Sequence, residues 1–249
     1  MAASPFRGFA FRGTGPGPLM EQAFDTIVDI DVRGSNLALL GGRRDGSGKL
    51  APDGALVWQG SLSSRLRDLK PIYFSPARSG EKSMGWCHFL ETGVVNFLQD
   101  GRLFLVPGVE PGALLYDTNG RLIRSWPTDH LNFVDRCPFD YQQSALYARD
   151  YEARLEWLRA HRTVDDALEL KDGPAVIVRK SSDRGTTWSL LIFQWDGKTR
   201  EVALPLKSDS RNARIRADQR GSAVAFLVID AEVPGRKALP SQVLIGDIR

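Results

Sequence analysis

Hydrophobic and polar positions alternate in short runs along most of the chain, and Gly, Asp and Asn separate these runs. This pattern is typical of antiparallel strands rather than of strands that alternate with helices. One unit recurs four times: a strand, a turn that contains Gly, a second apolar strand, a loop and a third strand. The first two strands of the four copies span residues 27–32 and 37–40, 94–98 and 103–106, 167–170 and 175–178, and 215–217 and 223–229.

The third strands are predicted at residues 55–58, 113–116, 188–193 and 242–245. In the second and third copies, Asn119-Gly120 and Asp196-Gly197 lead into fourth strands at 122–126 and 200–204. Both dipeptides favour the two-residue type I′ turn, in which both central residues have positive φ. We therefore interpret each copy as a four-stranded meander.

A single meander exposes both of its faces, so neighbouring copies must stack around a common axis to bury them. The predicted fold is all-β: a β-propeller of four-stranded blades with one helical insertion, forming a single domain over residues 1–249. The copies are further apart than the roughly 40 to 50 residues of a plain blade, which indicates insertions. We place these at residues 60–69, 76–90 and 127–167.

The insertion at 127–167 contains the predicted helix, at about residues 141–161. Tyr147, Tyr151, Leu155 and Leu158 recur at helical spacing on one face, and the other face is charged. We interpret this helix as a lid packed on the propeller, in preference to a partner-binding helix. Thr163 followed by Asp166 is predicted to cap a further short turn.

One motif has a specific structural reason. Its sequence is S-x-D-x-G-x-T-W, and its five defined residues are Ser181, Asp183, Gly185, Thr187 and Trp188. It resembles the Asp-box of sialidase-like propellers, a stabilising turn that carries no activity. We expect Ser181 and Asp183 to accept hydrogen bonds from turn amides, Gly185 to adopt positive φ, and Trp188 to pack beneath the hairpin.

A second resemblance concerns the blades. Residues 13–17, with the strands at 27–32 and 37–40, resemble the blade entry of NHL-type propellers, and residues 114–122 resemble their third-to-fourth strand hairpin. That family implies six blades, of which four are legible here. The last copy also has only three strands. Either residues 6–12 supply its fourth strand, or the chain is the C-terminal part of a longer propeller.

Composition and charge limit the classes of binding partner and the cellular location. The chain has 249 residues and a net charge of +3, too slight a surplus to indicate nucleic acid as the partner. No apolar run approaches the length of a membrane span, and residues 1–18 contain no signal-peptide core. Cys87 and Cys137 are either two free buried thiols or one disulfide that joins two loops. The disulfide would require an oxidising compartment, so an extracytoplasmic location would follow only if the chain is a truncated exported propeller.

The sequence contains no standard catalytic motif. His88, His130 and His161 do not stand at metal-ligand spacing with one another or with Cys, and no phosphate-binding or nucleophile-elbow motif occurs. We expect no cofactor. A lactonase-like metal site would draw on Asp29, Asp31, Asn96 and Glu169, which lie on or near inner strands. A glycosidase-like site would need convergent arginines and a Tyr–Glu pair, and the family motif that supplies the first arginine is absent.

The predicted ligand face is the one that carries the fourth-to-first and second-to-third strand connections. The candidate residues on its loops are Trp86, His88, Glu110, Asp135 and Arg136, and Cys87 and Cys137 lie on the same face. From the fold analogy we predict a non-enzymatic binding or scaffold propeller for a protein or small-molecule ligand. The alternative is a propeller hydrolase, lactonase-like or glycosidase-like, that uses the mouth of the central channel.

Overall fold

A computed structural model of the chain describes residues 24–43, 55–63, 68–74, 93–108, 112–131, 150–229 and 242–247. Within these ranges, the strands form three four-stranded antiparallel sheets and one three-stranded antiparallel sheet, each a simple meander. The first sheet contains β1 (Phe24–Arg33), β2 (Asn36–Arg43), β3 (Ala55–Ser61) and β4 (Lys70–Phe74). The second contains β5 (Val94–Phe97), β6 (Leu103–Val106), β7 (Ala113–Tyr116) and β8 (Leu122–Trp126).

The C-terminal half continues the same organisation. The third sheet contains β9 (Thr163–Leu170), β10 (Gly173–Ser182), β11 (Gly185–Phe193) and β12 (Thr199–Ser208). The fourth contains β13 (Arg214–Arg220), β14 (Ala223–Ile229) and β15 (Gln242–Asp247). The predicted all-β propeller with four copies of one meander is therefore confirmed. Four blades are formed by the described residues, and the six blades of the NHL resemblance are not confirmed.

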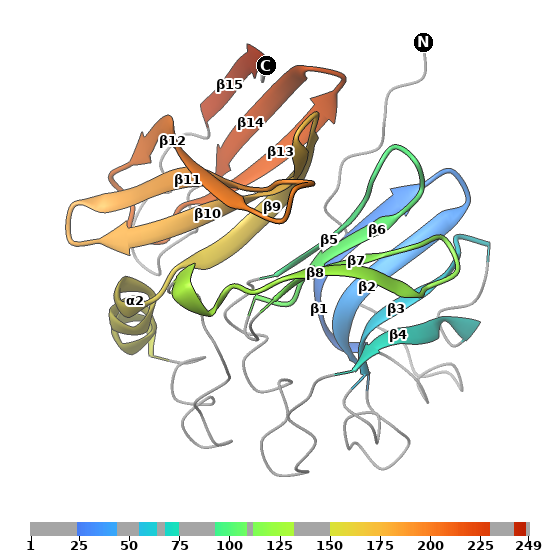
Figure 1. Cartoon of the computed structure of the whole chain (residues 1–249). Helices are drawn as coiled ribbons and strands as arrows, with labels where there is room; N and C mark the ends of the chain where they lie inside the picture. Colours follow the sequence, from blue (N-terminus) through green and yellow to red (C-terminus); the bar gives the residue numbers. More distant parts are fainter. Residues whose placement is uncertain are drawn as a thin grey trace.

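The four sheets are arranged as blades around a common centre (Figure 1). The first strand of each blade contacts the first strand of the next, from β1 to β5, β5 to β9 and β9 to β13. On β13, Arg216 also reaches back to Asp29 on β1, with 3.7 Å between guanidinium nitrogen and carboxylate oxygen. The first strands are thus the inner strands of the propeller.

Among the described residues, each pair of blades that are consecutive in the chain encloses its own hydrophobic core. Between blades 1 and 2 it includes Leu40, Val95 and Leu105. Between blades 2 and 3 it centres on the aromatic side chains of Phe104, Trp126 and Phe193, whose ring centroids are 5.6 to 6.3 Å apart. Between blades 3 and 4 it includes Ile177, Ile215 and Phe226. Each buried side chain of this size stabilises the fold by about 1.5–3 kcal/mol, so stacking is what stabilises the individual meanders.

The helix is shorter than the sequence indicated. α2 spans Tyr151–Ala160, and Asp150 is its N-cap, with extended backbone and a side chain that accepts the Ala153 amide at 3.1 Å. A continuous helix over 141–161 is therefore wrong at Asp150, and residues 141–149 lie outside the described ranges. Thr163 and Asp166 lie in strand β9 rather than in a capped turn. The strand also means that residues 163–167 belong to blade 3 and not to the insertion. No described helix is long and apolar enough to cross a membrane.

The hairpin turns differ from the predicted type. The Gly120 amide donates to the Asp117 carbonyl, and Gly197 donates to Gln194 in the same way. Asn119 and Asp196 therefore occupy the third position of a four-residue turn, and glycine follows with φ of 79° and 92°. This is the longer hairpin loop, in which a type I turn is followed by a left-handed glycine.

The strand β4 was not predicted, because a strand that begins Lys-Pro has no clear alternation of polar and apolar residues.

Candidate functional site

The loop residues proposed from the sequence as ligand-binding lie outside the described ranges. They are Trp86, His88, Glu110, Asp135 and Arg136, together with Cys87 and Cys137. Their roles, and the choice between free thiols and a disulfide, remain predictions. The sites that the structure does describe are the turn that resembles an Asp-box and the ends of the inner strands.

The motif that resembles an Asp-box forms the β10–β11 turn. Gly185 has the expected positive φ, and a Cβ there would approach the Ser208 carbonyl oxygen to 2.0 Å. The turn is capped by Ser182, whose hydroxyl accepts the Arg184 amide and donates to the Gly185 carbonyl. Asp183, predicted to cap it, instead pairs with Arg159 of α2 at 3.0 Å.

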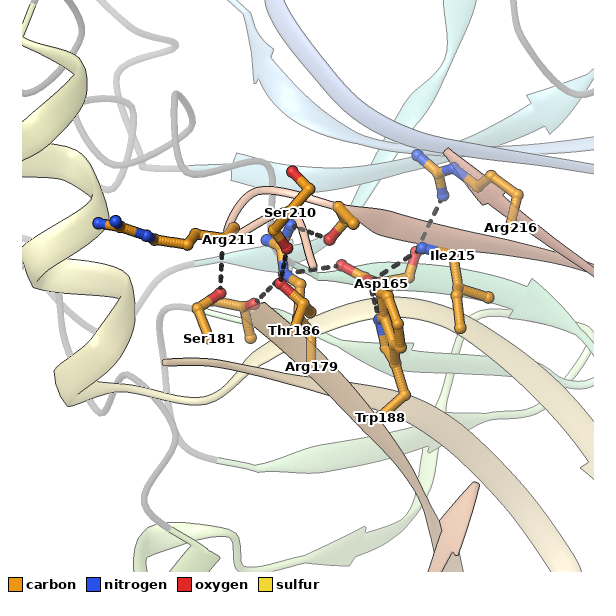
Figure 2. Close-up of polar contacts among 11 residues, drawn as sticks. Asp165, Arg179, Ser181, Thr186, Trp188, Ser210, Arg211, Ile215 and Arg216 are labelled. Atoms are coloured by element: carbon orange, nitrogen blue, oxygen red, sulfur yellow. Dashed lines mark hydrogen bonds and ion pairs between the residues drawn. The ribbon is translucent and has the colours of Figure 1, made fainter. Parts of the chain in front are cut away.

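The other motif residues connect blade 3 to the segment that precedes β13 (Figure 2). The Ser181 hydroxyl donates to the Arg211 carbonyl rather than accepting a turn amide, and the neighbouring Thr186 donates to Ser210. Thr187 is exposed, and Trp188 is buried as expected. The Asp-box itself is therefore not confirmed, and these residues form a structural link between blades 3 and 4.

A buried ion pair lies at the centre of this link. The side chains of Asp165 and Arg179 are each 1% exposed, and Asp165 Oδ1 lies 3.3 Å from Arg179 Nε. The other carboxylate oxygen accepts the Trp188 indole N–H at 2.8 Å and the Ile215 amide at 3.1 Å (Figure 2). Arg179 Nε itself donates to Thr163 Oγ1 at 2.9 Å, so Oδ1 contacts the guanidinium only as an ion pair. The two donors to the other oxygen and the charge of Arg179 together offset the cost of burying the carboxylate.

Inner-strand carboxylates join neighbouring blades by accepting backbone amides. Asp29 and Asp31 on β1 accept the amides of Val95 and Phe97 on β5, at 3.0 and 2.6 Å. The two carboxylates are two residues apart, so they lie on the same face of the strand. Hydrogen bonds to a carboxylate are about twice as strong as neutral ones, so these contacts fix the position of blade 2 on blade 1.

Two carboxylates join blades 3 and 4 in the same way, but here they belong to adjacent residues. Asp165 and Asp166 on β9 accept the amides of Ile215 and Ala217 on β13. Neighbouring residues of a regular strand point to opposite faces, but the register of β9 against β10 skips Asp165. The extra residue of this β-bulge allows both carboxylates to reach β13.

The ends of the four inner strands line a cleft of about 280 Å³ at the propeller axis. The lining residues are Arg33 from β1; Asn96, Phe97 and Gln99 from β5 and its turn; Ala167, Leu168 and Glu169 from β9; and Ala217, Asp218, Gln219 and Gly221 from β13 and its turn. This axial cleft lies on the face of the first-to-second strand turns, opposite the face that the sequence analysis selected.

Asn96 is the most deeply buried polar group of the axial cleft. Only 8% of the residue is exposed, and its side-chain amide opens onto the cleft without a hydrogen bond to another described residue. The neighbouring residues of β5 show its direction, because Val95 and Phe97 belong to the core with blade 1, whereas Val94 and Leu98 belong to the core with blade 3. Alternation therefore places the Asn96 amide on the blade 3 side, where Glu169 also lines the cleft.

Glu169 is half-buried, and its Oε2 accepts the Gln99 amide from the end of β5. Burial raises the pKa of the Glu169 carboxyl above its usual value of 4.5. The hydrogen bond from Gln99 and the charges of Arg33 and Arg102 lower this pKa, and the charge of Asp100 raises it. Gln219 holds the Glu169 backbone from blade 4, because its amide oxygen accepts the Glu169 N–H at 2.8 Å. The carboxylate is thus positioned by two neighbouring blades.

The four residues of the lactonase-like hypothesis are not brought together. Asp29 and Asp31 are engaged with the amides of β5, and only Asn96 and Glu169 line the axial cleft. Among the described residues, no three His, Cys, Asp or Glu side chains gather to hold a metal ion.

Sequence reasoning missed Arg33, Gln99, Asp218 and Gln219. The available signal was weak: a charged residue directly precedes the turn glycine after the first strand of every copy.

Comparisons with known proteins add no functional argument. The chain matches no family model and no curated protein. It is similar to the crystal structure of selenomethionine-substituted virginiamycin B lyase from Staphylococcus aureus, with 9% sequence identity and a TM-score of 0.30 over 92% of this chain and 88% of that one. A similarity this low carries no inference about activity.

Proposed function

We propose that this protein is a non-enzymatic binding propeller that takes a small polar ligand in the axial cleft. The observation that carries the proposal is the amide of Asn96, which belongs to a largely buried residue, opens onto the cleft and makes no hydrogen bond to another described residue. Water in the cleft can serve this amide, and a polar ligand that displaces the water can make the same hydrogen bonds directly.

The position of the cleft supports the same proposal. Four inner strands from four blades contribute its lining, and the carboxylate contacts between blades 1 and 2 and between blades 3 and 4 fix those strands. A site on such rigid elements is preorganised, so little conformational entropy is lost on binding. The volume of about 280 Å³ is just below the usual ligand-pocket range of about 300–1,000 Å³, which favours a metabolite-sized ligand over a peptide.

The test is thermal stabilisation by single probes from three classes: neutral monosaccharides, free amino acids and small carboxylic acids. A ligand at about 100 times its dissociation constant stabilises the folded state by about 2.7 kcal/mol, a clear shift in melting temperature. Asn96→Ala and the exposed cleft variant Asp218→Ala should weaken the shift. The matched control Asn119→Ala, an exposed turn residue outside the cleft lining, should retain it. The proposal fails if no probe class stabilises the protein, or if both cleft variants respond as the wild type does.

A hydrolase remains the second candidate because of one observation. Glu169, with its raised pKa, lines the axial cleft together with a second carboxylate, Asp218. Two carboxyl groups with different environments are the usual acid and base of glycoside hydrolysis. Chromogenic aryl glycosides and lactones distinguish the two functions: we expect no turnover, and turnover that Glu169→Gln abolishes would replace the binding proposal with the enzymatic one.

A further inference from the structure

We propose that the ligand of the axial cleft is a neutral polyhydroxylated molecule about the size of one sugar ring. This inference rests on the proposed binding function and adds the chemical class of the ligand. It follows from three properties of the cleft: the mixed signs of its charges, the hydrogen-bonding capacity of Asn96 and its small volume.

The charges of the axial cleft disfavour an ionic ligand. Arg33 contributes a positive charge, and its guanidinium is directed across β5 by a hydrogen bond to the Phe97 carbonyl at 3.2 Å. Glu169 and Asp218 contribute negative charges on the opposing strands. An ion of either sign would meet a like charge as well as an opposite one in this small space, so the cleft offers it little net attraction. A neutral ligand does not depend on that attraction.

The polar groups of the cleft match hydroxyl groups. The Asn96 amide offers both a donor and an acceptor, the Glu169 carboxylate accepts and the Arg33 guanidinium donates. A hydroxyl group can donate and accept at once, so adjacent hydroxyls on one ring can satisfy all three side chains. An amine satisfies only the acceptors, and a carboxylate satisfies only the donors. Because donors and acceptors come from three different strands, a rigid ring that presents several hydroxyls is the simplest complement.

The remaining walls of the cleft suit the rest of such a ring. Phe97, Leu168 and Ala217 contribute apolar lining, against which the C–H groups of a sugar can pack. A volume of about 280 Å³ leaves no room for a long chain of linked rings, so we expect one ring, or the end of a longer molecule, to occupy the cleft.

The experiment is an NMR titration of the wild-type protein that follows the Asn96 side-chain amide resonance, assigned by its loss in Asn96→Ala. The neutral probes are D-glucose, D-galactose and myo-inositol, and the ionic probes are L-lysine and acetate. We expect at least one neutral probe to shift the Asn96 resonance with saturation. Its affinity should be equal at about 0.05 M and about 0.5 M salt, because screening acts on ions. Glu169→Gln should weaken its binding about tenfold or less, because the amide keeps an acceptor.

The outcomes separate this inference from the broader function. If lysine or acetate shifts the Asn96 resonance with saturation and the neutral probes do not, the ligand class is wrong and the binding function stands. If a neutral probe binds but its affinity falls steeply with salt, the argument from charge is wrong. If no neutral or ionic probe shifts Asn96 up to about 10 mM, weaker than ordinary metabolite affinity, both proposals are overturned.

Discussion

Replacing Asp165 with Asn should show how strongly the buried ion pair holds blades 3 and 4 together. The change preserves the size of the side chain and removes its charge, so the buried guanidinium of Arg179 loses its ion pair with Asp165. The amide oxygen of the variant can still accept from the Trp188 indole and the Ile215 amide, as Oδ2 does in the wild type, so the change isolates the ion pair. Breaking a buried pair by removing one partner costs about 3–5 kcal/mol.

That loss is large compared with the stability of a whole protein, which is about 5–15 kcal/mol. For a chain of this size it corresponds to a fall in melting temperature of about 6–20 °C. Urea unfolding followed by circular dichroism measures it directly. Asp183→Asn is the matched control, because it makes the same chemical change in an ion pair whose carboxylate is 80% exposed. Exposed pairs contribute about 0–1 kcal/mol, so this variant should unfold nearly as the wild type does.

A double-mutant cycle isolates the pair itself. Arg179→Met removes the guanidinium, and combining it with Asp165→Asn should cost much less than the sum of the two single losses, because neither charge is then left alone. If Asp165→Asn loses less than about 1 kcal/mol, the value expected for an exposed pair, the buried ion pair does not hold the two blades together. Additive single losses would show that the two residues act independently.

Three further predictions test the core, the backbone and the cleft. Trp126→Ala should lose about 3–5 kcal/mol in urea unfolding, because the indole packs on Phe104 and Phe193 between blades 2 and 3; a loss under about 1 kcal/mol would contradict this core. Gly173→Ala should cost more than Gly197→Ala in the same assay: both have positive φ, but only at Gly173 would a Cβ lie 2.0 Å from a backbone oxygen, of Phe193. Equal losses would show that backbone conformation alone matters. The raised pKa of Glu169 means that the folded state binds its proton more tightly than the unfolded state, so this group's stabilisation is complete below pH 4.5 and is lost as pH rises through the raised value. Melting temperature measured from pH 4 upward should therefore fall relative to that of Glu169→Gln; parallel profiles would be inconsistent with a raised pKa.

Strand periodicity and glycine turns were enough to predict the four sheets. Each strand carries its own alternation, and each first-to-second strand turn is marked locally by a glycine such as Gly101 or Gly221, so both features can be read within about ten residues. The stacking of the blades was also predictable, because each meander leaves apolar faces that a neighbouring blade can bury. The local pattern did not give the start of the helix. It predicted a helix over residues 141–161, but the Asp150 side chain caps α2, which begins at Tyr151.

The candidate cleft could not be predicted in the same way. Asp29 and Asp31 looked like metal ligands, because an inner-strand carboxylate has the same local sequence whether it faces the axis or accepts an amide of the next blade. Their actual partners, Val95 and Phe97, are both 66 residues away. The relative height of neighbouring blades decides that pairing, and no local pattern encodes this height.

The amino-acid sequence by itself determined that this chain forms successive antiparallel meanders that must bury one another's faces, because alternation and turn chemistry act between near neighbours. Only the tertiary structure decided which polar groups form hydrogen bonds between blades and which line the cleft at the axis. Asp165 reaches β13 because a bulge turns it there, whereas Asn96 lines the cleft because alternation along β5 places it on the side of blade 3. Such choices depend on long-range packing, in which each side chain takes whichever partner the neighbouring blade brings within reach.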